Sequence, residues 1–61
     1  MRYHGFIIEE DKTVENIYYI KTEDGSRPFT ETGVEMSIMS MQAETITEVL
    51  VYIDKNYLKR V

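Results

Sequence analysis

Short runs of apolar residues, some alternating with polar ones, predict strands in the N-terminal part of the chain. The runs at 2–9 and 16–21 are rich in aromatic and β-branched side chains, which favour extended structure. Asp24 and Gly25 follow the second run and form a strong signal for a tight hairpin turn. We therefore expect the chain to return beside this run as a strand at 27–31.

Residues 34–38 alternate strictly between apolar and polar side chains. Val34, Met36 and Ile38 share one side of the expected strand. The pattern predicts a half-buried strand whose apolar side, including Met36, faces the core.

The hydrophobic period becomes helical from about residue 42. The apolar residues then recur at the spacing of one helix face: Ile46, Val49, Leu50, Ile53 and Tyr57. Ser40 is a suitable N-cap, and the basic residues near the C-terminus complement the helix dipole. The pattern predicts one C-terminal helix over about 42–59, packed on a small antiparallel sheet of three to four strands.

This helix carries more apolar surface than its own sheet requires. Val51 and Leu58 lie seven residues apart on a second stripe, and Tyr52 lies on the other flank. Met39 and Met41 extend the same patch, and methionine adapts its shape to a partner. Two interpretations stay open: exposed apolar residues that need no explanation, or a homodimer interface that contains Val51 and Leu58.

The chain has 61 residues, which we expect to form a single α+β domain over 1–61. A domain of this size buries only about 60% of the surface that its unfolded chain exposes, so its core is marginal. Small domains often add disulfides, a metal or a second subunit. The sequence has no cysteine, one histidine and no calcium-loop spacing, so we expect no metal and no cofactor. Oligomerisation is the remaining source of stability.

The charge of the chain narrows the kind of partner. The net charge is −4, and all eleven acidic residues precede residue 55, together with only four of the seven basic ones. Direct nucleic-acid binding needs a basic stripe, so this balance argues against it. An acidic surface is instead attracted to basic proteins, including those that bind nucleic acid. The chain shows neither a membrane-spanning run nor a signal-peptide pattern, so we expect a cytoplasmic protein.

Residues suited to catalysis are scarce. No nucleophile motif surrounds the serines, the glycines form no phosphate loop, and His4 is the only candidate base. We therefore expect no catalytic site and no enzyme. Acidic residues cluster at Glu9, Glu10, Asp11 and Glu15. This cluster is interpreted either as a solvated loop or as a patch that attracts a basic partner.

Glu44 and Glu48 lie four residues apart on the side of the expected helix that faces away from the core. Like charges at this spacing repel each other mildly. The pair is therefore compatible with recognition of a basic partner and also with ordinary solvation.

Three stretches resemble the small, dimeric, phage-encoded inhibitors of uracil-DNA glycosylase. They are TEDG at 22–25, GVEMS at 33–37 and the helical TITEVLVYIDK at 45–55. The resemblance extends over most of the chain from Asn16 to Leu58. Members of that family carry aromatic residues between the second and third stretches, where this chain has methionines.

The resemblance implies a protein that mimics DNA. A dimer of this type presents an apolar pocket flanked by carboxylates, which captures the apolar side chain that the glycosylase inserts into DNA. The expected partner-binding residues are Met36, Met39, Met41, Glu44, Glu48 and Tyr52. A phage-encoded protein of this kind would act in the host cytoplasm. Two alternatives stay open: a homodimer that serves only structure or assembly, and a phage regulator that binds RNA polymerase.

Overall fold

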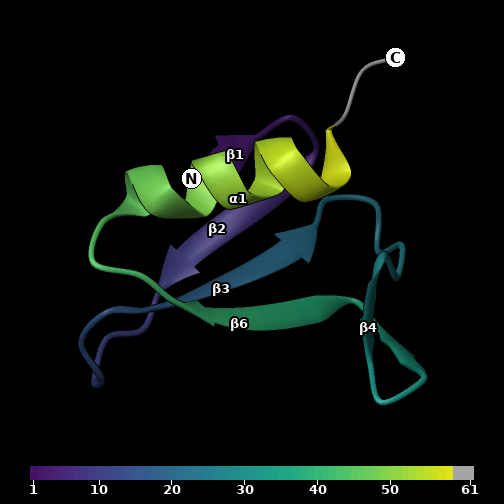
Figure 1. Ribbon diagram of the computed structural model, residues 1–61, viewed down its shortest axis with the longest axis horizontal. Helices are drawn as coiled ribbons and strands as arrows, with labels where there is room; N and C mark the ends of the chain where they lie inside the picture. The colour runs from purple at the N-terminus through teal and green to yellow at the C-terminus, as the bar shows by residue number, and fades with distance from the viewer. Residues whose placement is uncertain (59–61) are drawn as a thin grey trace.

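The computed structural model describes residues 1–58 as an α+β fold, drawn in Figure 1. An antiparallel sheet has the strand order β1-β2-β3-β6. Its strands are β1 (Arg2–Tyr3), β2 (Phe6–Glu10), β3 (Ile17–Thr22) and β6 (Ile38–Gln42). A separate hairpin consists of β4 (Phe29–Glu31) and β5 (Val34–Met36). One C-terminal helix, α1 (Ile46–Tyr57), packs on the sheet and confirms the predicted fold class.

The predicted strand at 2–9 is divided into two strands. His4 and Gly5 both have positive φ, 48° and 88°, and they turn the chain sharply between β1 and β2. Successive residues of positive φ suit the right-handed twist of a two-residue hairpin turn. As a result, Tyr3 pairs with Phe6. The prediction of one continuous strand was wrong, because aromatic and β-branched residues on both sides of the turn concealed it.

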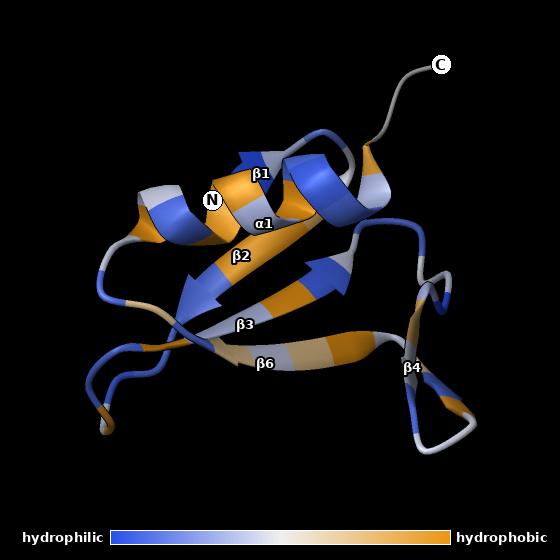
Figure 2. Ribbon diagram, viewed as in Figure 1, coloured by the Kyte–Doolittle hydropathy of each residue, from blue (hydrophilic) through white to orange (hydrophobic). Residues whose placement is uncertain are grey.

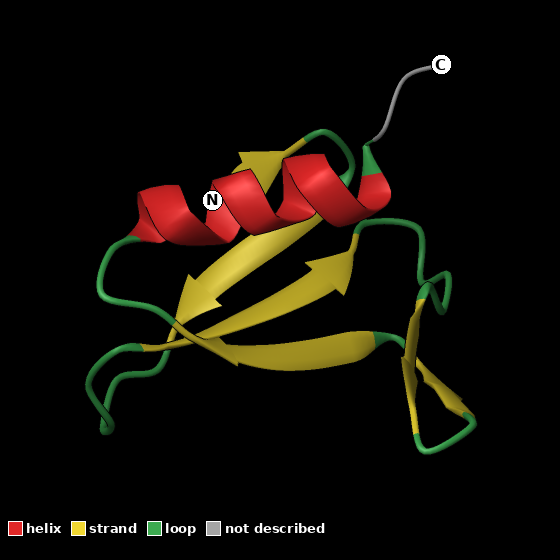
Figure 3. Cartoon of the chain, in the orientation of Figure 1, coloured by secondary structure: helices red, strands yellow, loops and turns green. Residues whose placement is uncertain are grey.

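The turn at Asp24 and Gly25 exists, but it does not lead into a strand beside β3. Gly25 has a φ of 77°, and the Asp24 carboxylate accepts a hydrogen bond from the Ser26 N–H (2.9 Å). The next strand, β4, pairs with β5, and β6 pairs with β3 instead. The predicted β3 partner was therefore wrong. The five-residue β6 forms a longer ladder with β3 than the three residues of β4 could offer. Figure 3 shows the β4–β5 hairpin standing apart from the sheet.

The alternating segment at 34–38 does not form one half-buried strand. The chain bends at Ser37, and the two halves join different sheets. Val34 and Ile38 are 62% and 51% exposed, so their predicted burial was wrong. Met36 is half-buried and packs against the core, as predicted. A single period cannot hold across the bend, because each half has its own inward face.

The helix begins later than the predicted residue 42, which is the last residue of β6. Thr45 is the N-cap, whereas the predicted cap, Ser40, lies within β6. Thr45 and Glu48 form a capping box, which satisfies backbone N–H groups of the first turn. The helix ends at Tyr57; the predicted end at residue 59 lies outside the described residues.

The core is small and is built mainly from β2, β3 and α1. Its buried residues are Phe6, Ile8, Tyr18, Ile20, Phe29, Ala43, Val49 and Ile53. The remaining residues of the predicted helix face pack against this cluster and are half-buried. Figure 2 shows the hydrophobic residues of β2 lying under α1. The predicted inward face of the helix is thereby confirmed.

An aromatic cluster attaches the β4–β5 hairpin to the rest of the molecule. The ring of Phe29, from β4, lies 5.2 Å from the ring of Tyr57 and meets it edge-on. The Phe6 ring lies 5.9 Å from the same tyrosine. Edge-to-face aromatic pairs add about 0.5–1.5 kcal/mol beyond the area that they bury. The hairpin therefore packs on the end of the helix although it shares no ladder with the larger sheet.

Candidate partner-binding surface

The helix covers one side of the sheet face and leaves the other side partly open. Figure 1 shows α1 crossing in front of β1 and β2, with β6 at the opposite edge. The Tyr3 hydroxyl donates a hydrogen bond to an Asp54 carboxylate oxygen (2.8 Å), which joins β1 to the helix. Met39 and Met41 of β6 are only half-buried. The surface between β6 and α1 is thus one place where apolar side chains meet solvent.

A shallow hollow of about 370 Å³ lies between β6 and α1. It is lined by Met41, Thr47, Glu48, Val51, Tyr52 and Lys55. Met41, Val51 and Tyr52 supply its apolar wall, and Val51 is 44% exposed. We call these six residues the β6–α1 hollow. Three of the predicted partner-binding residues (Met41, Glu48 and Tyr52) and one predicted dimer-interface residue (Val51) come together in it.

The other predicted apolar contacts lie elsewhere. Met36, on β5, and Met39, on β6, are half-buried against the core, and neither lines the hollow. Leu58 follows the helix as its C-cap and also packs against the core. The second helical stripe is therefore divided: Val51 contributes to the hollow and Leu58 to the core side.

Glu48 has a structural role in addition to its place in the hollow. Its carboxylate oxygen Oε2 accepts hydrogen bonds from the backbone N–H groups of Glu44 (2.9 Å) and Thr45 (3.1 Å). These bonds fix the carboxylate at the start of the helix, where the dipole favours a negative charge. The side chain therefore presents a negative charge in a defined position beside the apolar wall. Glu44 is exposed and contributes its backbone to this arrangement.

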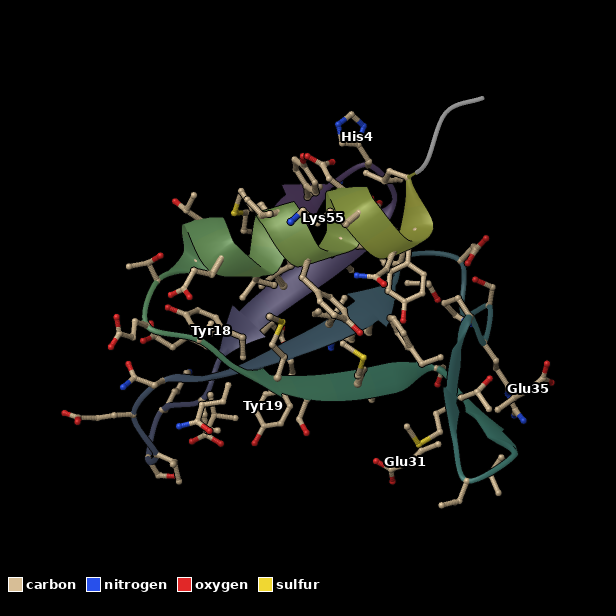
Figure 4. All side chains as sticks on the ribbon, viewed as in Figure 1. His4, Tyr18, Tyr19, Glu31, Glu35 and Lys55 are labelled. Carbon is tan, nitrogen blue, oxygen red and sulfur yellow. The ribbon has the colours of Figure 1, made fainter. Side chains whose placement is uncertain are left out.

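Thr47 and Lys55 were missed by the sequence analysis. Both are polar and do not belong to an apolar stripe, so hydrophobic spacing could not select them. Their positions relative to Val51, four residues before and four after, put all three on one side of a helix. Figure 4 shows Lys55 on the front of α1 in this view. The Tyr52 ring lies 6.1 Å from that of Tyr57, which connects the hollow to the aromatic cluster.

The acidic segment between β2 and β3 forms a second, larger concavity of about 990 Å³. Asp11 organises it: its carboxylate accepts hydrogen bonds from the Thr13 N–H (2.7 Å), the Val14 N–H (2.9 Å) and the Tyr19 hydroxyl. These donors, the tyrosine hydroxyl foremost, hold the pKa of Asp11 well below its usual range. The same bond raises the pKa of Tyr19. Asp11 is therefore a structural residue of the loop, which supports the solvated-loop interpretation for this member of the cluster.

The two adjacent tyrosines of β3 occupy different environments. Tyr18 is buried in the core, and Tyr19 is half-buried on the other face of the sheet. Figure 4 shows them extending to opposite sides of the strand. Adjacent residues of a strand point to opposite faces of the sheet, and the structure identifies Tyr18 as the inward residue.

His4, the only candidate base in the sequence, lies in the turn between β1 and β2. It is an exposed turn residue whose ring contacts the edge of the Tyr3 ring at 4.6 Å. Within residues 1–58, no three histidine, cysteine or acidic side chains are grouped as metal ligands would be. In the same part of the chain, no helix is long and apolar enough to cross a membrane.

Comparison with known proteins returns no relative. No protein-family model matches the chain. No curated protein and no solved structure matches it either. The fold and the β6–α1 hollow therefore define the class only as a small acidic α+β domain with a partly open apolar surface.

Proposed function

We propose that this protein is an acidic inhibitor of a DNA-acting enzyme, with uracil-DNA glycosylase as the first target to test. The observation that carries the proposal is the β6–α1 hollow, in which an apolar wall lies next to the fixed carboxylate of Glu48. A site of this composition suits an apolar side chain projecting from a basic protein surface.

The charge of the molecule supports a basic target. Two of its cations are already paired with carboxylates: Lys21 with Glu9 (3.3 Å) and Arg2 with Glu23 (3.7 Å). These exposed pairs contribute little to stability. Each pair uses one cation and one carboxylate, so the net charge of −4 is unchanged and acidic residues remain in excess. Complementary potential accelerates the encounter with a cationic surface.

The proposed mechanism is competition for the DNA-binding surface. The apolar side chain that the enzyme inserts into DNA enters the hollow and contacts Met41, Val51 and Tyr52. The carboxylates then lie against cationic groups that otherwise hold phosphates. The inhibitor is not turned over, because it reproduces charge and shape without offering a scissile bond.

The proposal includes a homodimer as the active form. A chain of 61 residues without cysteine has little means of stabilising a small core except a second subunit. Two copies would also double the number of carboxylates placed on one target. An assembly module without an enzyme target would share the dimer and lack the inhibition.

The test is uracil excision by a purified glycosylase on an oligonucleotide substrate, with increasing amounts of this protein. We expect dose-dependent loss of excision that is relieved by excess enzyme. Val51→Ser should weaken inhibition by about tenfold, which corresponds to about 1.4 kcal/mol. Val34→Ser is the matched control, since Val34 is equally apolar, more exposed and located on the hairpin away from the hollow.

Unchanged excision at a large molar excess of the folded protein would contradict the proposal. Equal loss of inhibition in both valine variants would contradict the assignment to the hollow. Binding of this protein to RNA polymerase subunits, without any effect on uracil excision by the glycosylase, would favour the alternative of a phage regulator.

A further inference from the structure

The free edge of β6 is the strongest unexplained feature of the described residues. Ladder bonds in an antiparallel pair alternate, so every second residue of an edge strand turns its N–H and C=O away from its neighbour. The Ala43 N–H donates to the Asn16 carbonyl oxygen (2.9 Å) at the end of the β3–β6 ladder. Counting back by two, Met41 and Met39 bond to β3. Ser40, between them, therefore directs its backbone groups outward.

This edge has none of the devices that usually protect an edge strand. Protective features are very short strands, charged side chains, proline and bulges. β6 is five residues long, reads IMSMQ and carries neither charge nor proline. The opposite edge of the sheet, β1, is only two residues long. The β1 edge thus offers little backbone for pairing, whereas the β6 edge is open to pairing with another strand.

We propose that β6 pairs with β6 of a second copy, antiparallel, about a twofold axis at Ser40. This inference rests on the proposed homodimer and specifies its interface. In this register Ser40 lies opposite Ser40 of the other copy, and Ile38 lies opposite Gln42. All outward N–H and C=O groups of the strand then find partners. The result is a continuous sheet of eight strands, built from the two four-stranded sheets.

The charge distribution favours a second copy of this chain as the partner of the β6 edge. Two molecules of net charge −4 repel unless the contact keeps their carboxylates apart. The β6 strand is uncharged, and in β3 its nearest charged partner is Lys21, opposite Ile38. A twofold contact along β6 therefore brings two acidic molecules together along a strand that carries no carboxylate.

The pairing also brings Met39 and Met41 of the two copies into contact. Met39 and Met41 lie on the face that carries α1, and in this register each faces the other methionine of the second copy. Each helix remains over its own β1 and β2, so the two helices flank a shared face. The floor of that face is a cluster of four methionines, and each side ends in a β6–α1 hollow. Methionine suits this position because it adapts to the shape of whatever enters.

Cross-linking tests the register directly. Ser40→Cys places an exposed thiol on the outer face, where hydrogen-bonded partners have Cα atoms about 5.5 Å apart. A short bifunctional thiol-reactive reagent, such as a bis-maleimide that alkylates both thiols, should convert this variant to a covalent dimer at low protein concentration. Ser26→Cys, also exposed but in the loop after β3, is the control and should stay monomeric. A mixture of Ile38→Cys and Gln42→Cys should cross-link between the two variants, whereas neither should do so alone.

A backbone variant tests the edge independently. Ser40→Pro removes an N–H that β3 does not use, and proline is tolerated where a strand edge faces solvent. We expect this variant to retain its circular dichroism spectrum and sediment as a monomer, while Ser40→Ala stays dimeric. A dimer without preferential Ser40→Cys cross-linking would overturn the β6 register and leave the proposed dimer standing. A protein that sediments only at the monomer mass of 7.2 kDa would overturn both. Glycosylase activity that is unaffected by a correctly cross-linked dimer would overturn the proposed function alone.

Discussion

At the scale of single residues, the three methionines of residues 36–41 have different positions. Met36 and Met39 pack against the core without reaching the hollow, and Met41 packs against the core while also lining it. The sequence could place them close together, but it could not separate these environments. Which methionine lies in which environment depends on the bend at Ser37, and no periodic pattern in the sequence predicts that bend.

Replacing methionines separates binding from stability. Met41→Ala should reduce inhibition of the target by about tenfold, because it removes part of the apolar wall. It should lower the melting temperature less than Met36→Ala does, since Met36 has no place in the hollow. Inhibition assays and thermal melts of both variants check this ranking. The reverse ranking would assign Met41 to the core alone.

Asp11 predicts a specific dependence of stability on pH. Its pKa is lower in the folded state than in the unfolded state. Ionised Asp11 therefore raises the free energy of unfolding above the ordinary unfolded pKa of about 3.9, and this contribution is lost progressively as the pH falls below that unfolded pKa toward the folded pKa. Asp11→Asn removes this titration. Urea unfolding should show wild type more stable than the variant at pH 7, with the gap narrowing toward pH 3. Tyr19→Phe removes the foremost donor to the carboxylate and should narrow the gap in part. A gap that is constant with pH would contradict the role of Asp11 as an ionised loop acceptor.

At the scale of secondary-structure elements, the helix depends on its capping box. Glu48 combines a cap with a charge, and two substitutions separate these functions. Glu48→Gln keeps an amide oxygen that accepts from the same backbone N–H groups, so the fold should be retained while inhibition weakens. Glu48→Ala removes the acceptor and should also destabilise the protein by about 1 kcal/mol. Chemical unfolding and inhibition of both variants provide the measurement. Full inhibition by Glu48→Gln would show that its charge is not used by the partner.

The element pattern was predictable where one period governed a whole segment. The inward face of α1 and the strand character of β2 and β3 followed from spacing and residue type. Strand partners were not predictable, because β4 and β6 compete for the same edge of β3. The outcome depends on which of them forms the longer ladder, and spacing along the chain does not reveal it. The helix start was also misplaced, since Ser40 and Thr45 are both acceptable caps and only the course of β6 selects between them.

The candidate site was predictable only for the residues that one helical period brings together. A helical repeat puts Glu48, Val51 and Tyr52 within one turn of each other, so the sequence could group them. Met41 joins them only because β6 runs along the open side of the sheet. Leu58 was grouped with Val51 by spacing, and its packing against the core depends on the end of the helix.

At the scale of the whole molecule, the proposed inhibition requires that a partner occupy the β6–α1 hollow. Val51→Asp adds a charge to the hollow at a residue that is 44% exposed and outside the buried core. We expect weaker inhibition, with the fold and the β6-paired dimer retained. Val34→Asp, on the β4–β5 hairpin, should leave inhibition unchanged as well. Inhibition assays, together with analytical ultracentrifugation and circular dichroism of the two variants, decide whether the effect is local to the hollow.

Uracil excision by purified glycosylase, titrated with this protein at low and at high salt, decides whether the acidic surface and the hollow engage a DNA-acting enzyme. We expect inhibition at low salt that weakens markedly as ionic strength rises, because salt screens the attraction between the carboxylates and a cationic surface. Excision at its full rate at low salt, in the presence of excess folded protein, would contradict the proposed inhibition.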